Sequence, residues 1–479
     1  MSIELKNLVE IEEQKSLSVA VELTSKKNAP KLQSFAHGVD QNNWLLIAGT
    51  NEGLHNLNGN YASTSFLEKA FNQNIYVYDV SKDLSISITI EELEAIINSN
   101  FKSYSSILKE FITVFRNTNS LSTQVGEYLY IAGGYGPESF TGKSENYITY
   151  NQIAQIHIPS LIALVKRDYV NVDAKNLFAF GSHSNFAVTG GELLHFNDTF
   201  YLSFGQNFGA TAQQGQKYAD AVYPFTLTPS FVKYGLLINM QCSAISDVEY
   251  PTLPSSDTSS IFRRRDCPIV PSLYKNPTNN KIENGLAVFA GVFKAGFPPA
   301  AWSDAIYIHP TFKNNSNAKR YTQDSAYNQN NYNVYTCPNF SLYESKDGKD
   351  IQHTFLIGGI GNGKLGFTNT ALHIQTNMAE LKSTSSVIEN VFDNPIADKK
   401  YFGSEAVLIP NNKLVRFKNS ETSSSSEIID LKETLELDSN IKIGYIFGGI
   451  ESDKKNPQGG QGNTQASNKI WKVSVSIDS

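Results

Sequence analysis

One short pattern recurs along the chain and constrains the fold more than any other feature: an apolar, strand-like run that ends in glycine. It occurs as WLLIAGT from Trp44, YLYIAGGYG from Tyr128, FYLSFGQNFG from Phe200, LAVFAGVF from Leu286, TFLIGGIGNG from Thr354 and GYIFGGIE from Gly444. The aligned glycines are Gly49, Gly133, Gly205, Gly291, Gly358 and Gly448. Because glycine tolerates positive φ and close backbone neighbours, the pattern predicts a repeated strand that leaves a crowded sheet.

Two other strand-like segments accompany each glycine strand. One follows the glycine after a polar loop and alternates apolar with polar residues, as in SDAIYIHP (303–310) and NKIWKVSVS (468–476). Such alternation indicates a strand with one buried face. The other segment precedes the glycine strand, as in GGELLHFNDTF (190–200), where a polar turn between two runs predicts a hairpin. With a variable fourth segment, each repeat predicts a four-stranded blade.

Six such repeats predict an all-β fold, a six-bladed β-propeller that occupies residues 1–479 as one domain. Seven blades stay open, because the long fourth-strand regions could contain an atypical blade. The alternating strand at about 16–25 is expected to complete the last blade and so close the ring. Helical periodicity predicts a helical insertion at about 88–115 with Thr89 as its cap, and a brief helix at 160–168. The segment at about 411–440 is expected to be a flexible loop.

Composition limits the partners and the compartment. Charged residues make up 18% of the chain and the formal net charge is -6, so a nucleic-acid partner is not expected. No apolar run approaches the roughly 20 residues of a membrane helix, so no membrane span is expected. The acidic segment 1–16 lacks the apolar core of a signal peptide, which favours a cytoplasmic location and leaves export by another route open. The three cysteines form no metal-ligand spacing, and no cofactor-binding motif occurs in its required context, so no cofactor is expected.

The double glycine followed by an aromatic-rich N-x-I-Y/W strand resembles the kelch repeat, and the resemblance covers nearly the whole chain. Three repeats depart from it, with Gly49-Thr50, Gly205-Gln206 and Ala290-Gly291 in place of the double glycine. The layout is similar to that of a group of bacterial kelch-like proteins. The resemblance implies that the loops after the second strands and those leading into the first strands gather on one face, around a central channel.

An arginine cluster on this face is the first candidate ligand site. The segment IFRRRDCPIV (261–270) is expected to enter the innermost strand of the fourth blade. Alternation would direct Arg263 and Arg265 to one side and Arg264 and Asp266 to the other. Arginine presents a planar fork to carboxylates and phosphates, so the cluster predicts an anion clamp. The alternative is a set of internal salt bridges with Asp266 and nearby acids.

Other candidates follow the aligned glycines. Tyr135, Gln206, Phe208 and Asn362 form a predicted aromatic and amide rim suited to a sugar or a peptide, with loop packing as the alternative. Three weaker candidates for proton transfer are Glu52, His55 and Glu192. His37 and Asp40 could join His55 at a metal, but no spacing rule supports that, and no metal site is predicted.

These features favour a binding or scaffold module whose loop face contacts a protein or carbohydrate partner. One alternative is an isomerase or mutarotase acting on a sugar acid, with Glu52, His55 and Glu192 as candidate acid and base groups. Another is a structural subunit or cargo of a larger bacterial assembly, docked through the acidic N-terminal arm. The sequence does not indicate an oligomeric state.

Overall fold

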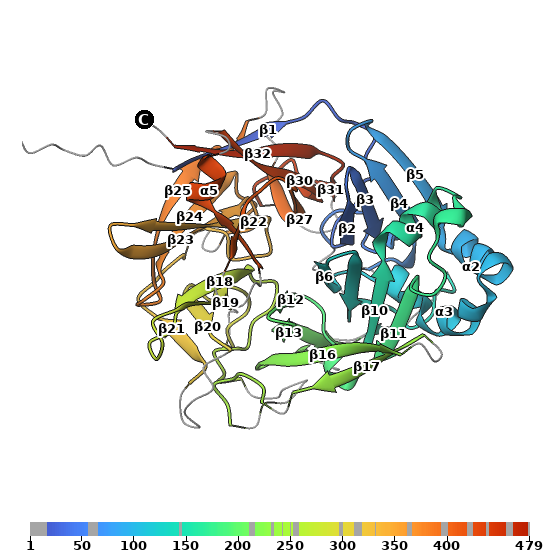
Figure 1. Cartoon of the computed structure of the whole chain (residues 1–479), viewed down its shortest axis with the longest axis horizontal. Helices are drawn as coiled ribbons and strands as arrows, with labels where there is room; N and C mark the ends of the chain where they lie inside the picture. The colour runs from blue at the N-terminus through green and yellow to red at the C-terminus, as the bar shows by residue number, and fades with distance from the viewer. Residues whose placement is uncertain are drawn as a thin grey trace, which may run out of the picture.

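The regular structure of the computed structural model is mostly β-strand, in sheets arranged around a common centre (Figure 1). The residues that the structure describes are 17–55, 66–142, 146–209, 216–230, 234–241, 243–249, 251, 258–296, 300–310, 319–330, 332–361, 366–393, 401–418, 425–436, 440–456 and 463–477. The acidic arm at 1–16 and Asn362 lie outside this part.

Six successive groups of four antiparallel strands, here called units 1 to 6, account for most of the sheets. Unit 1 contains β2 (Ala36–Asp40), β3 (Asn43–Ile47), β4 (Asn74–Asp79) and β5 (Leu84–Thr89). Unit 2 contains β6 (Leu121–Val125), β7 (Tyr128–Ala132), β10 (Gln152–His157) and β11 (Phe178–Ser182). Unit 3 contains β12 (Glu192–Phe196), β13 (Thr199–Ser203), β16 (Val222–Ser230) and β17 (Gly235–Met240).

The second half of the chain repeats the arrangement. Unit 4 contains β18 (Ile269–Lys275), β19 (Ile282–Phe289), β20 (Ala305–Ile308) and β21 (Tyr321–Asp324). Unit 5 contains β22 (Asn339–Lys346), β23 (Lys349–Ile357), β24 (Thr370–Asn377) and β25 (Lys382–Glu389). Unit 6 contains β27 (Tyr401–Pro410), β30 (Asn440–Ser452), β32 (Ile470–Ile477) and β1 (Leu17–Leu23). The first strand of each unit lies nearest the centre (Figure 1).

The two ends of the described chain meet in unit 6. The strand expected at 16–25 is β1, and it pairs antiparallel with β32 from Leu17 opposite Ile477 to Leu23 opposite Trp471. Units 2 and 3 are joined at their outer edges by a parallel contact between β11 and β17, at Phe180 and Gly235. Apolar faces of neighbouring units pack together, as where Val21 and Val473 of unit 6 share a buried cluster with Leu342 of unit 5.

Two consecutive residues with positive φ directly follow the second strand in units 1 to 5 and lie within β30 in unit 6, and these six turn pairs correct the glycine alignment. The pairs are Ala48-Gly49, Gly133-Gly134, Phe204-Gly205, Ala290-Gly291, Gly358-Gly359 and Gly448-Gly449. Gly49, Gly205 and Gly291 are therefore second members, whereas Gly133, Gly358 and Gly448 are first members. In three units the first position is alanine or phenylalanine, so the sequence there has no double glycine to mark the pair.

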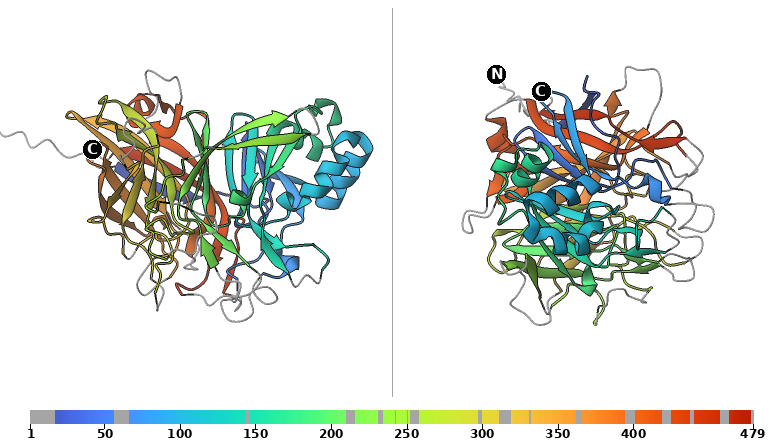
Figure 2. Two further views of the ribbon diagram at one scale, coloured as in Figure 1. Left: turned by 90° about the horizontal axis from the view of Figure 1, so that it is seen from below. Right: turned by 90° about the vertical axis from the view of Figure 1, so that its right-hand side faces the viewer.

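The helical insertions lie at one side of the ring, as the blue and teal helices of Figure 2 show. Helix α2 (Ile90–Asn100) begins at Thr89, whose hydroxyl accepts from the Glu92 amide while the Glu92 carboxylate accepts from the Thr89 amide. This capping box confirms Thr89 as the cap. Helices α3 (Ser105–Phe111) and α4 (Ile158–Val165) account for the rest of the helical predictions.

The prediction of a flexible loop at 411–440 is wrong for much of this segment. Strands β28 (Arg416–Lys418) and β29 (Ser425–Asp430) pair with each other, and β29 also pairs with β22. Helix α5 (Leu431–Leu435) follows directly. Ile428, Ile429 and Leu431 are buried, so apolar side chains beside the serine-rich stretch order this segment against unit 5.

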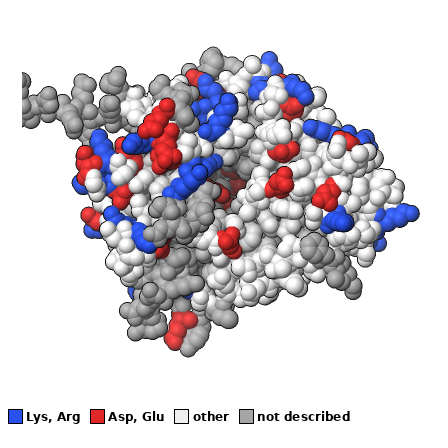
Figure 3. All heavy atoms as spheres, viewed as in Figure 1, with Lys and Arg blue, Asp and Glu red and all other residues white. Residues whose placement is uncertain are grey.

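Charged side chains of both signs are interspersed on the face seen in Figure 1, and a hollow opens at the centre of the ring (Figure 3). Every helix in the described residues is too short or too polar to cross a membrane.

Candidate functional site

A cavity of about 680 Å³ lies where the innermost segments of the six units converge. Each unit contributes two residues bridged through their backbones: one preceding or within its first strand, and one directly after its turn pair. The bridged pairs are Gln33 with Thr50, Thr118 with Tyr135, Thr189 with Gln206, Arg265 with Val292, Val334 with Ile360, and Ser404 with Ile450. All twelve residues line the cavity. The same backbone geometry therefore presents a different pair of side chains from each unit.

A chain of backbone hydrogen bonds links the units beside the cavity. The linked residues are Ser34, Asn119, Gly190, Asp266, Thr336 and Glu405, and each amide from Asn119 onward donates to the carbonyl of the residue before it in this series, over 2.7 to 3.4 Å. Five of the six have positive φ, Thr336 being the exception. We call this series the belt. It holds the six units in register where the cavity side chains are attached.

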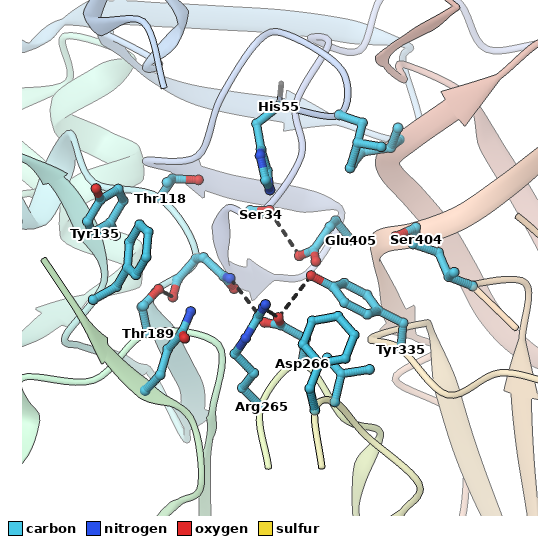
Figure 4. A pocket seen from close by; sticks show the side chains of 18 of the residues that line it. Ser34, His55, Thr118, Tyr135, Thr189, Arg265, Asp266, Tyr335, Ser404 and Glu405 are labelled. Carbon is cyan, nitrogen blue, oxygen red and sulfur yellow. Dashed lines mark hydrogen bonds and ion pairs between the residues drawn. The ribbon is translucent and has the colours of Figure 1, made fainter. Parts of the chain in front are cut away.

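Polar side chains of the belt and of its neighbours Arg265 and Tyr335 converge in the cavity (Figure 4). The Ser34 hydroxyl donates to Glu405 Oε2 over 2.9 Å, and the Tyr335 hydroxyl donates to Asp266 Oδ2 over 2.9 Å. Arg265 forms an ion pair with Asp266. Burial raises the pKa of the Glu405 carboxyl to about 7, although Ser34 and Arg265 oppose that shift. Glu405 can therefore exchange a proton near neutral pH.

The arginine cluster does not follow the predicted alternation. The three arginines precede β18 and do not enter it, and Asp266 has φ 47°. A left-handed residue breaks the period of two on which alternation depends, so Arg265 and Asp266 both line the cavity. The prediction that Asp266 would lie with Arg264 is wrong for this reason.

Arg264 is structural. Its side chain is fully buried, and its guanidinium pairs with Asp304 Oδ1 at 2.9 Å. It also donates to the carbonyl oxygens of Ile261 and Ala290 and lies 4.3 Å from the ring centre of Trp302. Burial lowers the pKa of this guanidinium. The internal salt-bridge alternative therefore holds for Arg264, and Arg264 does not line the cavity.

Arg263 also lines the cavity. Its guanidinium lies 3.9 Å from the ring centre of Tyr218 and donates to the carbonyl of Phe293. The indole N–H of Trp302 donates to the Arg263 carbonyl over 3.1 Å, which fixes the backbone. The aromatic ring and the two hydrogen bonds hold the cation in place before any ligand arrives.

An aromatic series forms another wall. His55 stacks on Phe66 at 4.6 Å, Phe66 meets the edge of Tyr135 at 5.2 Å, and Tyr135 lies 5.1 Å from Phe208. The His55 ring is directed into the cavity (Figure 4). Tyr135 and Phe208, both predicted rim residues, are brought together here.

Four oxygen atoms of cavity-lining side chains are buried without a hydrogen-bond partner among the described residues. They are Thr50 Oγ1, Tyr135 Oη, Gln206 Oε1 and Ser404 Oγ. They come from units 1, 2, 3 and 6. By contrast, the surfaces contributed by Val334, Ile360, Phe367 and Ile450 are apolar. These four oxygens lie just beneath the cavity surface, in residues that line it together with apolar side chains.

The remaining predicted residues divide between the cavity and other places. Glu52 is exposed and lines the cavity beside His55. Glu192 lies on β12 and does not line it, although burial and the charge of Glu427 raise its pKa to about 8. His37 and Asp40 lie on β2 and do not line the cavity either, so the structure does not bring them to His55 there.

Neither a metal cluster nor a similarity to known proteins identifies the ligand. Within the ranges given above, no three His, Cys, Asp or Glu side chains are grouped to hold a metal ion. The chain matches no protein-family model, and no curated protein matches it. The function must therefore be inferred from the cavity itself.

Sequence reasoning missed Glu405, Ser34, Tyr335 and Tyr218. A signal was present for two of them, because Ser34 and Glu405 precede or begin apolar runs in QSFAHGV and SEAVLI, as Asn119 and Asp266 do in their own units. Aligning the repeats on the start of the first strand, and not only on the glycines, would have placed these residues together.

Proposed function

We propose that the chain is a six-bladed, kelch-like propeller that binds a carbohydrate or another small hydroxyl-rich ligand in its axial cavity. The six units, their turn pairs, the bridged pairs and the belt support six blades, because each feature recurs once per unit except for the glycine and φ departures described above. The cavity volume of about 680 Å³ suits a small ligand.

The observation that carries the binding proposal is the set of four buried oxygens without partners. An unsatisfied buried polar group costs about 1–3 kcal/mol, so a side-chain rotation that brings one of these oxygens into contact with a bound ligand would recover part of that cost. Sugar hydroxyls can both donate and accept, and the apolar face of a sugar ring can pack on the half-buried rings of the aromatic wall, His55 and Phe66. Carbohydrate chemistry therefore matches both surfaces of the cavity.

Tyr135→Phe tests this proposal, because it removes one such oxygen and keeps the ring. We expect equal or higher thermal stability, since an unsatisfied hydroxyl is removed, together with about 3- to 10-fold weaker ligand binding. Binding would be measured by calorimetry with ligands selected from a glycan and monosaccharide array. The matched control is Tyr104→Phe, which alters a buried tyrosine of the helical insertion.

Two results would contradict the proposal. One is the absence of binding to every carbohydrate in the array. The other is binding that Tyr135→Phe and Tyr104→Phe leave equally unchanged, which would place the ligand away from the cavity oxygens.

A second candidate function, sugar isomerisation or mutarotation, is supported by Glu405. This carboxyl has a pKa of about 7 and lies in the cavity with Tyr335 and with His55 directed inward (Figure 4). Such a group can accept and return a proton at neutral pH. Proton-exchange NMR on reducing sugars should then show catalysis that Glu405→Gln abolishes, whereas Glu192→Gln should leave the rate unchanged because Glu192 lies outside the cavity.

A further inference from the structure

The charges that line the cavity are unequally paired. Arg265 is matched by Asp266, Glu405 is hydrogen-bonded to Ser34, and Glu52 also lines the cavity without an ion pair in the described ranges. Arg263 and Lys294 also line the cavity, and neither forms an ion pair with any residue in the described ranges. Both side chains are half-buried. Two positive charges in unit 4 are therefore not neutralised by the described part of the protein.

Aromatic rings and the backbone position these two cations. Arg263 lies over Tyr218 at 3.9 Å, and Lys294 lies over Trp302 at 5.0 Å. Arg263 donates to the carbonyl of Phe293, the residue directly before Lys294, so both cations belong to one wall. A cation–π contact positions a charge without neutralising it, because the ring carries no net charge. The wall thus presents fixed cations that form no ion pair within the described ranges.

We propose that this wall is an oxyanion subsite, in which Arg263 and Lys294 bind a carboxylate or phosphate carried by the cavity ligand. This inference rests on the proposed carbohydrate function and narrows it to acidic or phosphorylated sugars. The guanidinium fork of Arg263 matches two oxygens of either group, and Lys294 adds a point charge. The body of the ligand then extends toward Tyr135 and Gln206, which also line the cavity.

Calorimetry on the full chain with glucose, glucuronate and glucose 6-phosphate tests the subsite. We expect both charged probes to bind at least 10-fold more tightly than glucose, with an advantage that shrinks as NaCl is raised. Arg263→Gln should weaken the charged probes by about 10- to 100-fold and leave glucose unchanged. Lys294→Gln should give a smaller loss, and it keeps the test valid if Arg263→Gln fails to fold. A preference between glucuronate and glucose 6-phosphate distinguishes carboxylate from phosphate.

Two controls separate the subsite from the carbohydrate proposal. Arg167→Gln removes an exposed guanidinium, paired with Glu92 on the helical insertion, and should change nothing. Inorganic phosphate alone should raise the melting temperature of the parent protein and not that of Arg263→Gln.

Each outcome decides one of the two proposals. Equal binding of glucose and glucuronate, unaffected by Arg263→Gln, would overturn the subsite and keep the carbohydrate function. Stabilisation by phosphate that depends on Arg263, without binding of any sugar, would keep the subsite and overturn the carbohydrate function. No response to any anion would overturn the subsite.

Discussion

The residues that line the cavity differ in kind from those directly behind them. In the lining layer, Tyr135 and Gln206 have buried oxygens without described partners, and Arg263 has an unpaired charge in the described structure. In the supporting layer, Arg264 is paired with Asp304 and packed on Trp302. Buried polar atoms without a described partner also occur away from the cavity, so the two layers differ chiefly in the ion pairing of the adjacent Arg263 and Arg264.

The turn pairs and the residues directly after them show a similar contrast between constrained and variable positions. Their residues are glycine, alanine or phenylalanine, whereas the residues directly after them are Thr50, Tyr135, Gln206, Val292, Ile360 and Ile450. Steric crowding restricts the residue types in the turn pair, whereas the residue type at the next position differs between units. Substitutions behind the cavity should therefore affect stability, and substitutions in its lining should affect binding more than stability.

The largest effect is expected at adjacent arginines. Arg264→Met should lower the free energy of unfolding by about 3–5 kcal/mol, because it leaves Asp304 buried and uncompensated. Arg263→Met should cost less than about 1 kcal/mol, because its guanidinium is partly exposed and has no described ion pair. Midpoints of urea and thermal unfolding would measure both. Similar losses for the two variants would contradict the division into layers.

This division could be only partly predicted from the sequence. Strand alternation and recurring glycines were sufficient to predict the mostly β architecture, and the capping pattern at Thr89 was sufficient to place α2. The orientation of Asp266 was not predictable, because it depends on a positive φ that no glycine marks. Glu405 was missed because its role arises from belt contacts with segments far away in the chain, such as its bond to Ser34.

The next effect concerns the first position of the turn pair, where Gly133 and Ala48 are equivalent. Gly133→Ala should lower stability by about 2–4 kcal/mol, because a methyl group at positive φ is strained and would meet the Val188 carbonyl. Ala48→Gly should change stability by less than about 1 kcal/mol, because the site already accommodates its methyl and glycine relieves the strain. Thermal unfolding distinguishes them, and equal tolerance of both changes would mean that crowding does not determine this position.

The smallest effect concerns Glu405 and depends on pH. Its folded-state pKa is about 7, above an ordinary value of 4.5. Between these pH values the folded protein holds a proton that the unfolded chain releases, so this group lowers the free energy of unfolding as pH rises through the interval. Each pKa unit corresponds to 1.36 kcal/mol, and partial exposure reduces the total to roughly 2 kcal/mol.

Glu405→Gln removes this titration and should gain stability relative to the parent protein between pH 4.5 and 7.5. The measurement is the difference in melting temperature between the two proteins at several pH values. Glu380→Gln, a change at an exposed carboxylate, is the control and should show a flat difference. A flat difference for Glu405→Gln as well would mean that the carboxyl is ionised throughout this range. Glu405 would then remain a hydrogen-bond acceptor of the cavity but could not act as a proton donor at neutral pH, which would separate the binding function from the isomerase alternative.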